Sequence, residues 1–481
     1  MIFPKTPGDK TLRIRSMLAG LCVLLATALF PAPVSADNPI IQTLFTADPA
    51  PMVHNGTVYL YTSHDEDEAR NFVMRDWRLY TSTDMVNWTD HGAVASLKTF
   101  PWARQDNDAW APQVIARGGK FYLYVPISVA GSPKNVLAVA VADTPYGPFK
   151  DALGHALIPP GNDNIDPTVA IDGDGQAYLY WGNPDLWRVK LNPDMISTSG
   201  PAVKMPRLTD YQEGPWFYRR AGHYYMAFAS TCCPEGIGYA MSDHATGPWQ
   251  YKGSIMDHDK RSSGNHPGII DYKGHSYVFG FNYRFNDAQT REHRERRSVT
   301  VTEFHYNPDG TIPMQPWWDT IGAKQLGTIN PFRRVEAETI AWTSASDTSA
   351  SGAHNWAPGV RTAKSAGGMY VTHVLDGGYI VVRGVDFGTG AGKSFDATVA
   401  AAAGGSTIDL RLDSLTGPRV ATLAVPATGG AETWRSETTP LARTRGVHDV
   451  FLVFHGKPGA DLFNFDAWQI GTGRGKPRAS R

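Results

Sequence analysis

The sequence predicts an all-β protein, in which a five-bladed β-propeller is followed by a β-sandwich of the jelly-roll type. Two observations predict this class. A strand motif recurs through the first two thirds of the chain, and near Thr328 the composition changes to Gly- and Ala-rich segments with alternating strands. Helical periodicity is absent, and 481 residues are too many for one ordinary domain.

Residues 1–36 are predicted to be a secretory signal peptide. Basic residues precede an apolar run from Met17 to Phe30, and Val34-Ser35-Ala36 forms a small-residue cleavage pattern. The run is shorter than the roughly 20 residues that a membrane-spanning helix needs. We therefore expect a secreted or periplasmic protein that has no membrane segment after cleavage.

Residues 37–328 carry the recurring motif. Each copy has Gly, two residues, Tyr and an apolar or aromatic residue, which is typical of a turn that leads into a β-strand. The copies begin at Gly56, Gly119, Gly175, Gly222 and Gly274. A spacing of about 50 residues accommodates four short strands, the content of one propeller blade. Five blades are therefore predicted, and chance similarity among β-hairpins is the alternative.

Charge and cysteine content narrow the function. The chain has 45 basic and 46 acidic residues, whereas a nucleic-acid-binding protein needs a basic surface to displace counterions. We therefore expect no nucleic-acid partner. Cys232 and Cys233 are adjacent, and they are the only cysteines that follow the predicted signal peptide. Export favours oxidation, so a disulfide between neighbours and two buried thiols are both open.

Three acidic residues lie beside a proline or a Gly-Pro pair, each about ten residues before the tyrosine of its repeat. They are Asp48, Asp166 and Glu213. Each alone has an ordinary alternative in turn chemistry. Together they occupy the same phase of three blades, so blade equivalence places all three at the central axis.

These three motifs, with Trp110-Ala111-Pro112 between the first two, resemble glycoside hydrolase family 43 over residues 40–325. The resemblance implies an inverting glycosidase on a five-bladed propeller. Asp48 is then the general base, Glu213 the general acid, and Asp166 the residue that orients the acid and tunes its pKa. No cofactor is needed for this chemistry.

Family resemblance also implies the substrate. The expected activity is exo-acting removal of xylose or arabinofuranose from xylan or arabinoxylan, so the partner is a plant cell-wall polysaccharide or oligosaccharide. An endo-arabinanase and a non-catalytic sugar-binding propeller are the alternatives.

The chemistry explains why three carboxyl groups are required. A glycosidic oxygen leaves only when it is protonated, so one carboxyl group must hold its proton at the working pH. Free Glu has a pKa of about 4.3, and a nearby carboxylate together with desolvation raises it. A second carboxylate must stay ionised and activate water on the opposite face of the sugar.

Three further residues of the first domain are assigned by the same resemblance. His266 is implied at the propeller centre, where it would help to hold a hydrated calcium ion; a neutral core histidine is the alternative. Arg284 resembles the active-site arginine of the family, with a surface ion pair as the alternative. Trp110 is either a wall of the sugar pocket or part of the core. The basic cluster from Arg291 to Arg297 is interpreted as a solvated loop.

Behind a linker at residues 329–334, we predict a β-sandwich over residues 335–471 and a loose basic tail over residues 472–481. The sandwich resembles carbohydrate-binding module family 6 through Glu336-Ala337-Glu338, Val385 to Gly388, Arg411 to Ser414, Thr428 to Gly430 and Phe463 to Asp466.

That second resemblance implies two binding sites. One is a structural calcium ion held by Glu336, Glu338 and Asp466, since a hard cation prefers oxygen ligands. The other is a sugar cleft that contains Trp434 and Asn464. Two departures from the family pattern, His373 and Ala431, speak against ordinary xylan binding; weak binding, binding through another face and a purely bracing role are the options.

Overall fold

The structure is a computed structural model that describes residues 35–161, 164–259, 264–289, 295–318, 321–344 and 360–473. The predicted signal peptide, apart from its last two residues, and the predicted tail from residue 474 lie outside the described residues. The prediction of an all-β protein is confirmed. The described ranges contain little helix, with α1 (Arg284–Gln289) and a short 3-10 turn, Leu97–Thr99, as the helical elements with described bounds. No described helix has the length and apolar character needed to cross a membrane.

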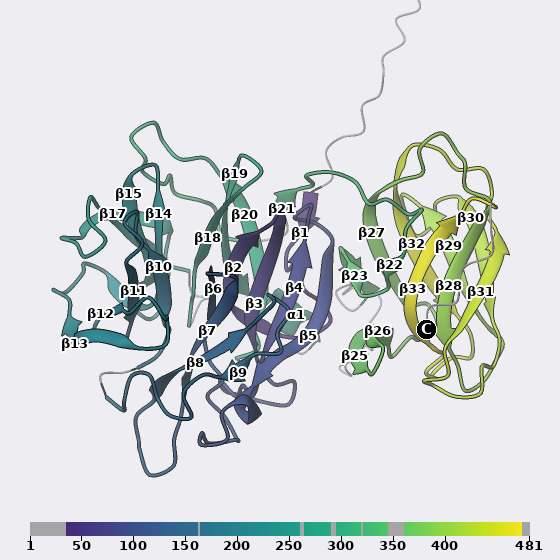
Figure 1. Ribbon diagram of the computed structural model, residues 1–481. Coiled ribbons are helices and arrows are strands. Elements are labelled where there is room, and N and C mark those ends of the chain that lie inside the picture. The colour runs from purple at the N-terminus through teal and green to yellow at the C-terminus, as the bar shows by residue number, and fades with distance from the viewer. Residues whose placement is uncertain are drawn as a thin grey trace, which may run out of the picture. The chain divides into compact units, whose positions relative to one another are not determined.

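Five antiparallel sheets follow one another along the N-terminal part of the chain (Figure 1). The first contains β2 (Thr46–His54), β3 (Thr57–His64), β4 (Asp76–Ser82) and β5 (Trp88–Ser96). The second contains β6 (Gln113–Arg117), β7 (Lys120–Ile127), β8 (Val136–Ala142) and β9 (Lys150–Asp151). The third contains β10 (Thr168–Ile171), β11 (Ala177–Trp181), β12 (Trp187–Leu191) and β13 (Thr198–Lys204).

The fourth sheet contains β14 (Tyr211–Arg220), β15 (His223–Ser230), β16 (Ile237–Ser242) and β17 (Gln250–Met256). The fifth contains β18 (Gly268–Tyr272), β19 (His275–Asn282) and β20 (Ser298–Phe304). A small extra pair joins β1 (Ser35–Asp37) to β21 (Ile321–Lys324). The recurring tyrosine always lies in the second strand of its sheet, directly after the turn that its glycine forms.

The first strands of successive sheets lie next to one another. β2 contacts β6 and β18, and β10 contacts β6 and β14. β14 is joined to β18 because the indole N–H of Trp216 donates to the carbonyl of Ile269 at 2.9 Å. The segment before β2 runs along β20: the backbone N–H groups of Ile40 and Thr46 donate to the carbonyls of Val299 and Arg297, each at 2.9 Å. The starts of these first strands are therefore brought together.

Two further sheets form a sandwich in the C-terminal part of the chain. One contains β22 (Val335–Glu336), β25 (Arg361–Ser365), β26 (Gly368–Thr372), β28 (Ser394–Ala400), β31 (Arg435–Pro440) and β33 (Asn464–Gly471). The other contains β24 (Trp342–Thr343), β27 (Tyr379–Asp386), β29 (Ser406–Leu412), β30 (Arg419–Val425) and β32 (Val447–His455).

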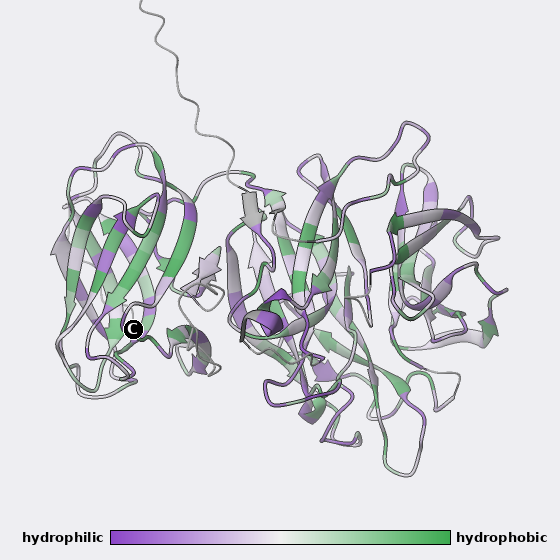
Figure 2. Ribbon diagram, turned by 180° about the vertical axis from the view of Figure 1, so that it is seen from behind, coloured by the Kyte–Doolittle hydropathy of each residue, from purple (hydrophilic) through white to green (hydrophobic). Residues whose placement is uncertain are grey.

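Apolar side chains from both sheets of the sandwich meet in one core, which includes Ile380, Phe395, Leu410, Leu452 and Trp468. Figure 2 shows hydrophobic residues along the strands of both parts of the chain. β23 (Thr339–Ile340) belongs to the predicted second domain by sequence, yet it extends the first sheet by pairing with β5. Apart from this pairing, the N-terminal sheets and the sandwich each have a hydrophobic core of their own.

Candidate active site

Asp48 lies at the start of β2 with a buried carboxyl group. Its Oδ1 accepts a hydrogen bond from Nη1 of Arg297 at 2.8 Å, and its Oδ2 accepts one from the hydroxyl of Ser63. Both Asp48 and Asp166 have left-handed backbone conformations, with φ of 52° and 57°. Non-glycine residues rarely adopt this conformation, and where they do so the strain is commonly functional.

Arg297 is the cation of this site. Its guanidinium group is buried and bonds both carboxylate oxygens of Asp65 at 3.0 and 3.1 Å, in addition to Asp48. The same group lies over the rings of Phe72 and Phe281, at 4.9 and 5.4 Å from the ring centres. Asp48 therefore has a fixed, buried positive partner in the wall of the site.

Asp166 and Glu213 are joined through the backbone. The N–H group of Gly214 donates to Oδ2 of Asp166 at 2.9 Å, and Oε2 of Glu213 accepts a hydrogen bond from the side chain of Asn183. Gly214 has a φ of 58°, and a Cβ atom there would lie 3.0 Å from the carbonyl oxygen of Asn265. A glycine is therefore required where this segment approaches the residue before His266.

Burial and mutual repulsion raise the pKa values of these two acids. Burial raises the pKa of Asp166 to about 7, and the charge of Asp48 adds to the rise. Burial also raises the pKa of Glu213 well above its ordinary value, and the charge of Asp166 is the next cause. Glu213 can consequently keep its proton near neutral pH, as a general acid must.

All three acids line one cavity of about 300 Å³. This volume is at the lower end of the roughly 300–1,000 Å³ of small-molecule sites. Its remaining lining residues are Phe72, Met74, Trp110, Ile165, Asn183, Gln212, Cys232, Glu235, Gly264, Asn265, His266 and Arg297. The sequence motifs far apart in the chain thus meet at one place.

Trp110 and His266, both predicted from the sequence, contribute to this wall. The indole N–H of Trp110 is buried and has no hydrogen-bond partner in the described part of the chain. His266 is buried, and burial lowers its pKa to about 4. The imidazole is therefore neutral at pH 7, as a core histidine or a metal ligand would be.

The predicted calcium ligands of the sandwich lie around one arginine. Arg334 forms ion pairs with Glu336 at 2.8 Å and with Asp466 at 2.9 Å. Glu338 is buried, and its Oε2 has no hydrogen-bond partner among the described residues. Burial raises the pKa of Glu338 to about 9, and the charge of Glu336 adds to the rise. A backbone hydrogen bond opposes it. Among the described residues, these three carboxyl groups do not have ligand atoms within 4.8 Å of one another, so a hard divalent cation would have to replace Arg334 between Glu336 and Asp466.

Asn464 begins β33, and Trp434 lies in the connection between β30 and β31, directly before β31. The Trp434 ring packs edge-on against Tyr370 of β26, with 5.2 Å between ring centres. The side-chain amide of Asn464 donates to the carbonyl of Ala431 at 2.7 Å. Tyr370 was not predicted from the sequence, and it supplies an aromatic ring beside Trp434 where the sequence pattern offered only His373.

Two family models match the chain. The model of glycosyl hydrolases family 43 matches residues 36–312, and that of the carbohydrate binding module (family 6) matches residues 336–472. The chain belongs to glycosyl hydrolase family 43. It also carries a family 6 module behind the family 43 domain.

Two arabinofuranohydrolases align with nearly the whole chain, including the family 6 module. An arabinoxylan arabinofuranohydrolase of Paenibacillus polymyxa is 34% identical, over 90% of this chain and 74% of the relative. One of Bacillus subtilis is 33% identical, over 95% of this chain and 96% of the relative. The crystal structure of a Bacillus subtilis arabinoxylan arabinofuranohydrolase in complex with cellotetraose superimposes with a TM-score of 0.76 at 31% identity, covering 90% of this chain and 97% of that one.

The prediction that Arg284 is the active-site arginine is wrong, because Arg284 does not line the cavity. Arg284 begins α1 outside the cavity, where its guanidinium group donates to the carbonyl of Asn38 at 2.9 Å and lies 5.8 Å from the ring of Trp342. Arg297 occupies the family 43 cavity instead. The interpretation of Arg291 to Arg297 as a solvated loop is also wrong at its end, because Arg296 and Arg297 are buried. Their position directly before an alternating strand is the signal that could have identified them.

Two more cavity residues of this family 43 enzyme were missed. Cys232 and Cys233 form a disulfide, and Cys232 lines the cavity. Their sulfur atoms and a carboxyl oxygen of Glu235 lie within 4.8 Å of one another. Bonded sulfurs are not thiolates, so this group does not have the ligands of a metal site. Glu235 was missed because a Pro-Glu-Gly sequence is typical of an ordinary turn.

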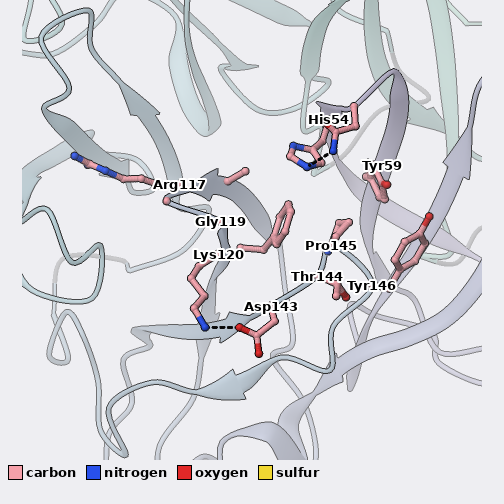
Figure 3. Close-up of a pocket in the computed structure, with 13 residues that line it drawn as sticks. His54, Tyr59, Arg117, Gly119, Lys120, Asp143, Thr144, Pro145 and Tyr146 are labelled. Carbon is pink, nitrogen blue, oxygen red and sulfur yellow. Dashed lines mark hydrogen bonds and ion pairs between the residues drawn. The ribbon is translucent and has the colours of Figure 1, made fainter.

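A second hollow, of about 600 Å³, lies at the far end of β2 (Figure 3). Its lining includes His54, Tyr59 and Tyr146, and an ion pair between Lys120 and Asp143. None of the carboxyl groups of the catalytic cavity reaches it. The three candidate catalytic acids therefore lie in the smaller cavity only.

Proposed function

We propose that the chain is an exo-acting, inverting glycosidase that removes arabinofuranose or xylose units from arabinoxylan-type polysaccharides or oligosaccharides. The observation that carries this proposal is the presence of two carboxyl groups with opposite surroundings in one cavity. Asp48 is bonded to a buried cation, whereas burial and the charge of Asp166 raise the pKa of Glu213. The arabinoxylan arabinofuranohydrolases, which align over at least 90% of this chain, support the choice of substrate.

Each step of the reaction uses one of these groups. Glu213 gives its proton to the glycosidic oxygen, and Asp48 accepts a proton from the water that attacks the opposite face of the sugar. Asp166 holds the N–H group of Gly214, so it fixes the backbone beside Glu213 while its charge keeps the acid protonated. Protonation and water attack on opposite faces invert the anomeric carbon.

We also infer that the five N-terminal sheets are the blades of a propeller, with the catalytic cavity at its axis. Support comes from the contacts between the first strands of successive sheets, since the innermost strands of a propeller surround its central channel. A small cavity at that place suits a single terminal sugar unit, which favours exo action.

The C-terminal module is proposed to bind calcium through Glu336, Glu338 and Asp466, and sugar through Trp434, Tyr370 and Asn464. Calcium near His266 remains a second proposal. The export signal predicted over residues 1–36 supports a location outside the cytoplasm, where polymeric plant substrates are found. None of these sites is needed for the acid–base chemistry itself.

The leaving group provides the sharpest test of Glu213. Glu213→Gln should lower kcat/KM on arabinoxylan oligosaccharides by roughly 10²–10⁴-fold, because the leaving oxygen is no longer protonated. With 2,4-dinitrophenyl arabinofuranoside, whose leaving group needs no proton, most of this loss should disappear. Asp48→Asn should be impaired on both substrates, because the attacking water still needs a base.

Proton NMR of the first product formed by the wild type checks inversion. Equal losses on both substrates for Glu213→Gln would refute its role as general acid. A product that keeps the anomeric configuration of the substrate would refute the inverting mechanism. Shortening of a linear arabinan, without release of single arabinose units, would favour the endo-acting alternative.

A further inference from the structure

A fourth carboxyl group lies in the wall of the catalytic cavity. Glu235 is in the turn between β15 and β16, and its side chain lines the cavity together with Asp48, Asp166 and Glu213. Only 1% of the residue is exposed to solvent. The acid, the base and the orienting acid are already present, so the acid–base scheme leaves Glu235 without a role.

The backbone around Glu235 fixes its carboxyl group. The N–H of Asn265 donates to Oε2 of Glu235 at 2.5 Å, and the side chain of Asn265 donates to the carbonyl of Gly236 at 3.4 Å. Arg297 donates to the carbonyl of Gly264 at 3.0 Å on the other side of this segment. Glu235 is thus held in one place, as a binding residue with a defined target needs to be.

Keeping a carboxyl group here has an energetic cost. Burial raises the pKa of Glu235 to about 7, although the hydrogen bond from Asn265 and the charge of Arg297 oppose the rise. An ionised carboxylate has about four acceptor positions, more than the backbone segment beside it can fill. A desolvated acceptor group that faces a cavity is compensated when a ligand supplies donors.

The wall also contains neutral polar side chains. Asn183 and Gln212, whose amides can donate and accept, line the same cavity as Glu235. Sugar hydroxyl groups donate and accept at the same time, so a wall with both acceptors and donors suits them. A purely apolar wall would not distinguish one hydroxyl position from another.

We propose that Glu235 accepts hydrogen bonds from the hydroxyl groups of the sugar unit in the cavity, and so determines which sugar is cleaved. This inference rests on the proposed function. Removal of a hydroxyl that Glu235 binds leaves a buried acceptor unpaired, which is the condition under which enzymes reject an analogue most strongly.

Deoxy substrates test this contact directly. Kinetics are measured with 4-nitrophenyl α-L-arabinofuranoside and its 2-, 3- and 5-deoxy analogues, for the wild type and Glu235→Gln. The variant should lose roughly 10–100-fold in kcat/KM on the parent sugar, since hydrogen bonds to charged groups are the stronger ones. On the analogue that lacks the bound hydroxyl, the variant and the wild type should differ by less than about 3-fold, because contacting groups are not additive.

Two further variants make the result unambiguous. Glu303→Gln changes a mostly buried carboxyl group outside the cavity, which bonds His275 at 2.8 Å, and it should leave the whole deoxy series unchanged. Glu235→Asp keeps the charge but shortens the side chain. Its loss in kcat/KM should therefore disappear on the same deoxy analogue as the loss of Glu235→Gln. Melting temperatures of all variants are measured beside the kinetics, and Glu235→Asp carries the test if Glu235→Gln does not fold.

An equal fold-loss on the parent sugar and on every deoxy analogue would overturn the inference, because it would show that Glu235 acts on the site as a whole. A wild type that hydrolyses neither the arabinofuranoside nor the corresponding xyloside would instead refute the proposed function. The two failures are therefore distinguishable in one set of measurements.

Discussion

Replacing Arg297 by methionine should destabilise the protein strongly. The side chain is 2% exposed, and its guanidinium group bonds Asp48 and both oxygens of Asp65. Asp65 is itself 0% exposed. Methionine fills much of the volume but leaves two carboxyl groups without their cation. Breaking a buried ion pair in this way costs about 3–5 kcal/mol, a large part of the 5–15 kcal/mol that stabilises an ordinary domain.

Urea denaturation at pH 7, followed by tryptophan fluorescence, measures the loss in the free energy of unfolding. The double variant Arg297→Met/Asp65→Asn should recover part of it, since one of the two stranded charges is removed. A coupling of about 1–3 kcal/mol between the two changes is expected for groups in one network.

Arg104→Met is the matched control. Arg104 also pairs with an aspartate, Asp106 at 2.6 Å, but its side chain is 44% exposed. Its loss should stay within about 1 kcal/mol, the range of surface ion pairs. If Arg297→Met cost no more than this control, the buried network would not hold the site together, and the reasoning would be refuted.

Two other predictions follow from the pKa values and from the sandwich. Burial raises the pKa of Asp166 to about 7. The contribution of this group to stability is therefore full below pH 4 and is lost as the pH rises through 7. In urea titrations, Asp166→Asn should have the same free energy of unfolding as the wild type at pH 4, and a value up to about 4 kcal/mol higher at pH 8. A variant no more stable at pH 8 would contradict that assignment. Calcium at 100 times its dissociation constant should stabilise the module by about 2.7 kcal/mol in calorimetry. EDTA should reverse this gain, Glu338→Gln should abolish it, and an unchanged response in that variant would exclude Glu338 as a ligand.

Local signals explain which parts of the fold could be predicted. The Gly-to-Tyr motif identifies a turn and the strand after it because turn chemistry and strand composition act over a few residues. Asp48, Asp166 and Glu213 could be found because each lies at the same phase of a repeat. Their placement in one cavity then follows from equivalent positions on neighbouring first strands.

Arg297 and Glu235 depend on contacts that no local pattern records. The partners of Arg297 lie 232 and 249 residues away in the sequence, so its burial could not be read from a run of charges that resembles a solvated loop. Glu235 occupies the connection between the second and third strands, where other repeats also have acids such as Asp65 and Asp185, so no repeat pattern distinguishes it. Tyr370 of β26 meets Trp434, which directly precedes β31, because both strands belong to one sheet of the sandwich.

The segment of residues 38–46 has a consequence for how the protein must be made. It hydrogen-bonds to β20, and the side chain of Asn38 also exchanges hydrogen bonds with the backbone of Val301, 263 positions along the chain. During synthesis this segment therefore emerges long before its partners on β20. It can form these hydrogen bonds only after nearly the whole family 43 domain has been made. A polypeptide that ended before Val301 would lack one of these partners, and a chain trimmed past Thr46 should hold β20 less firmly.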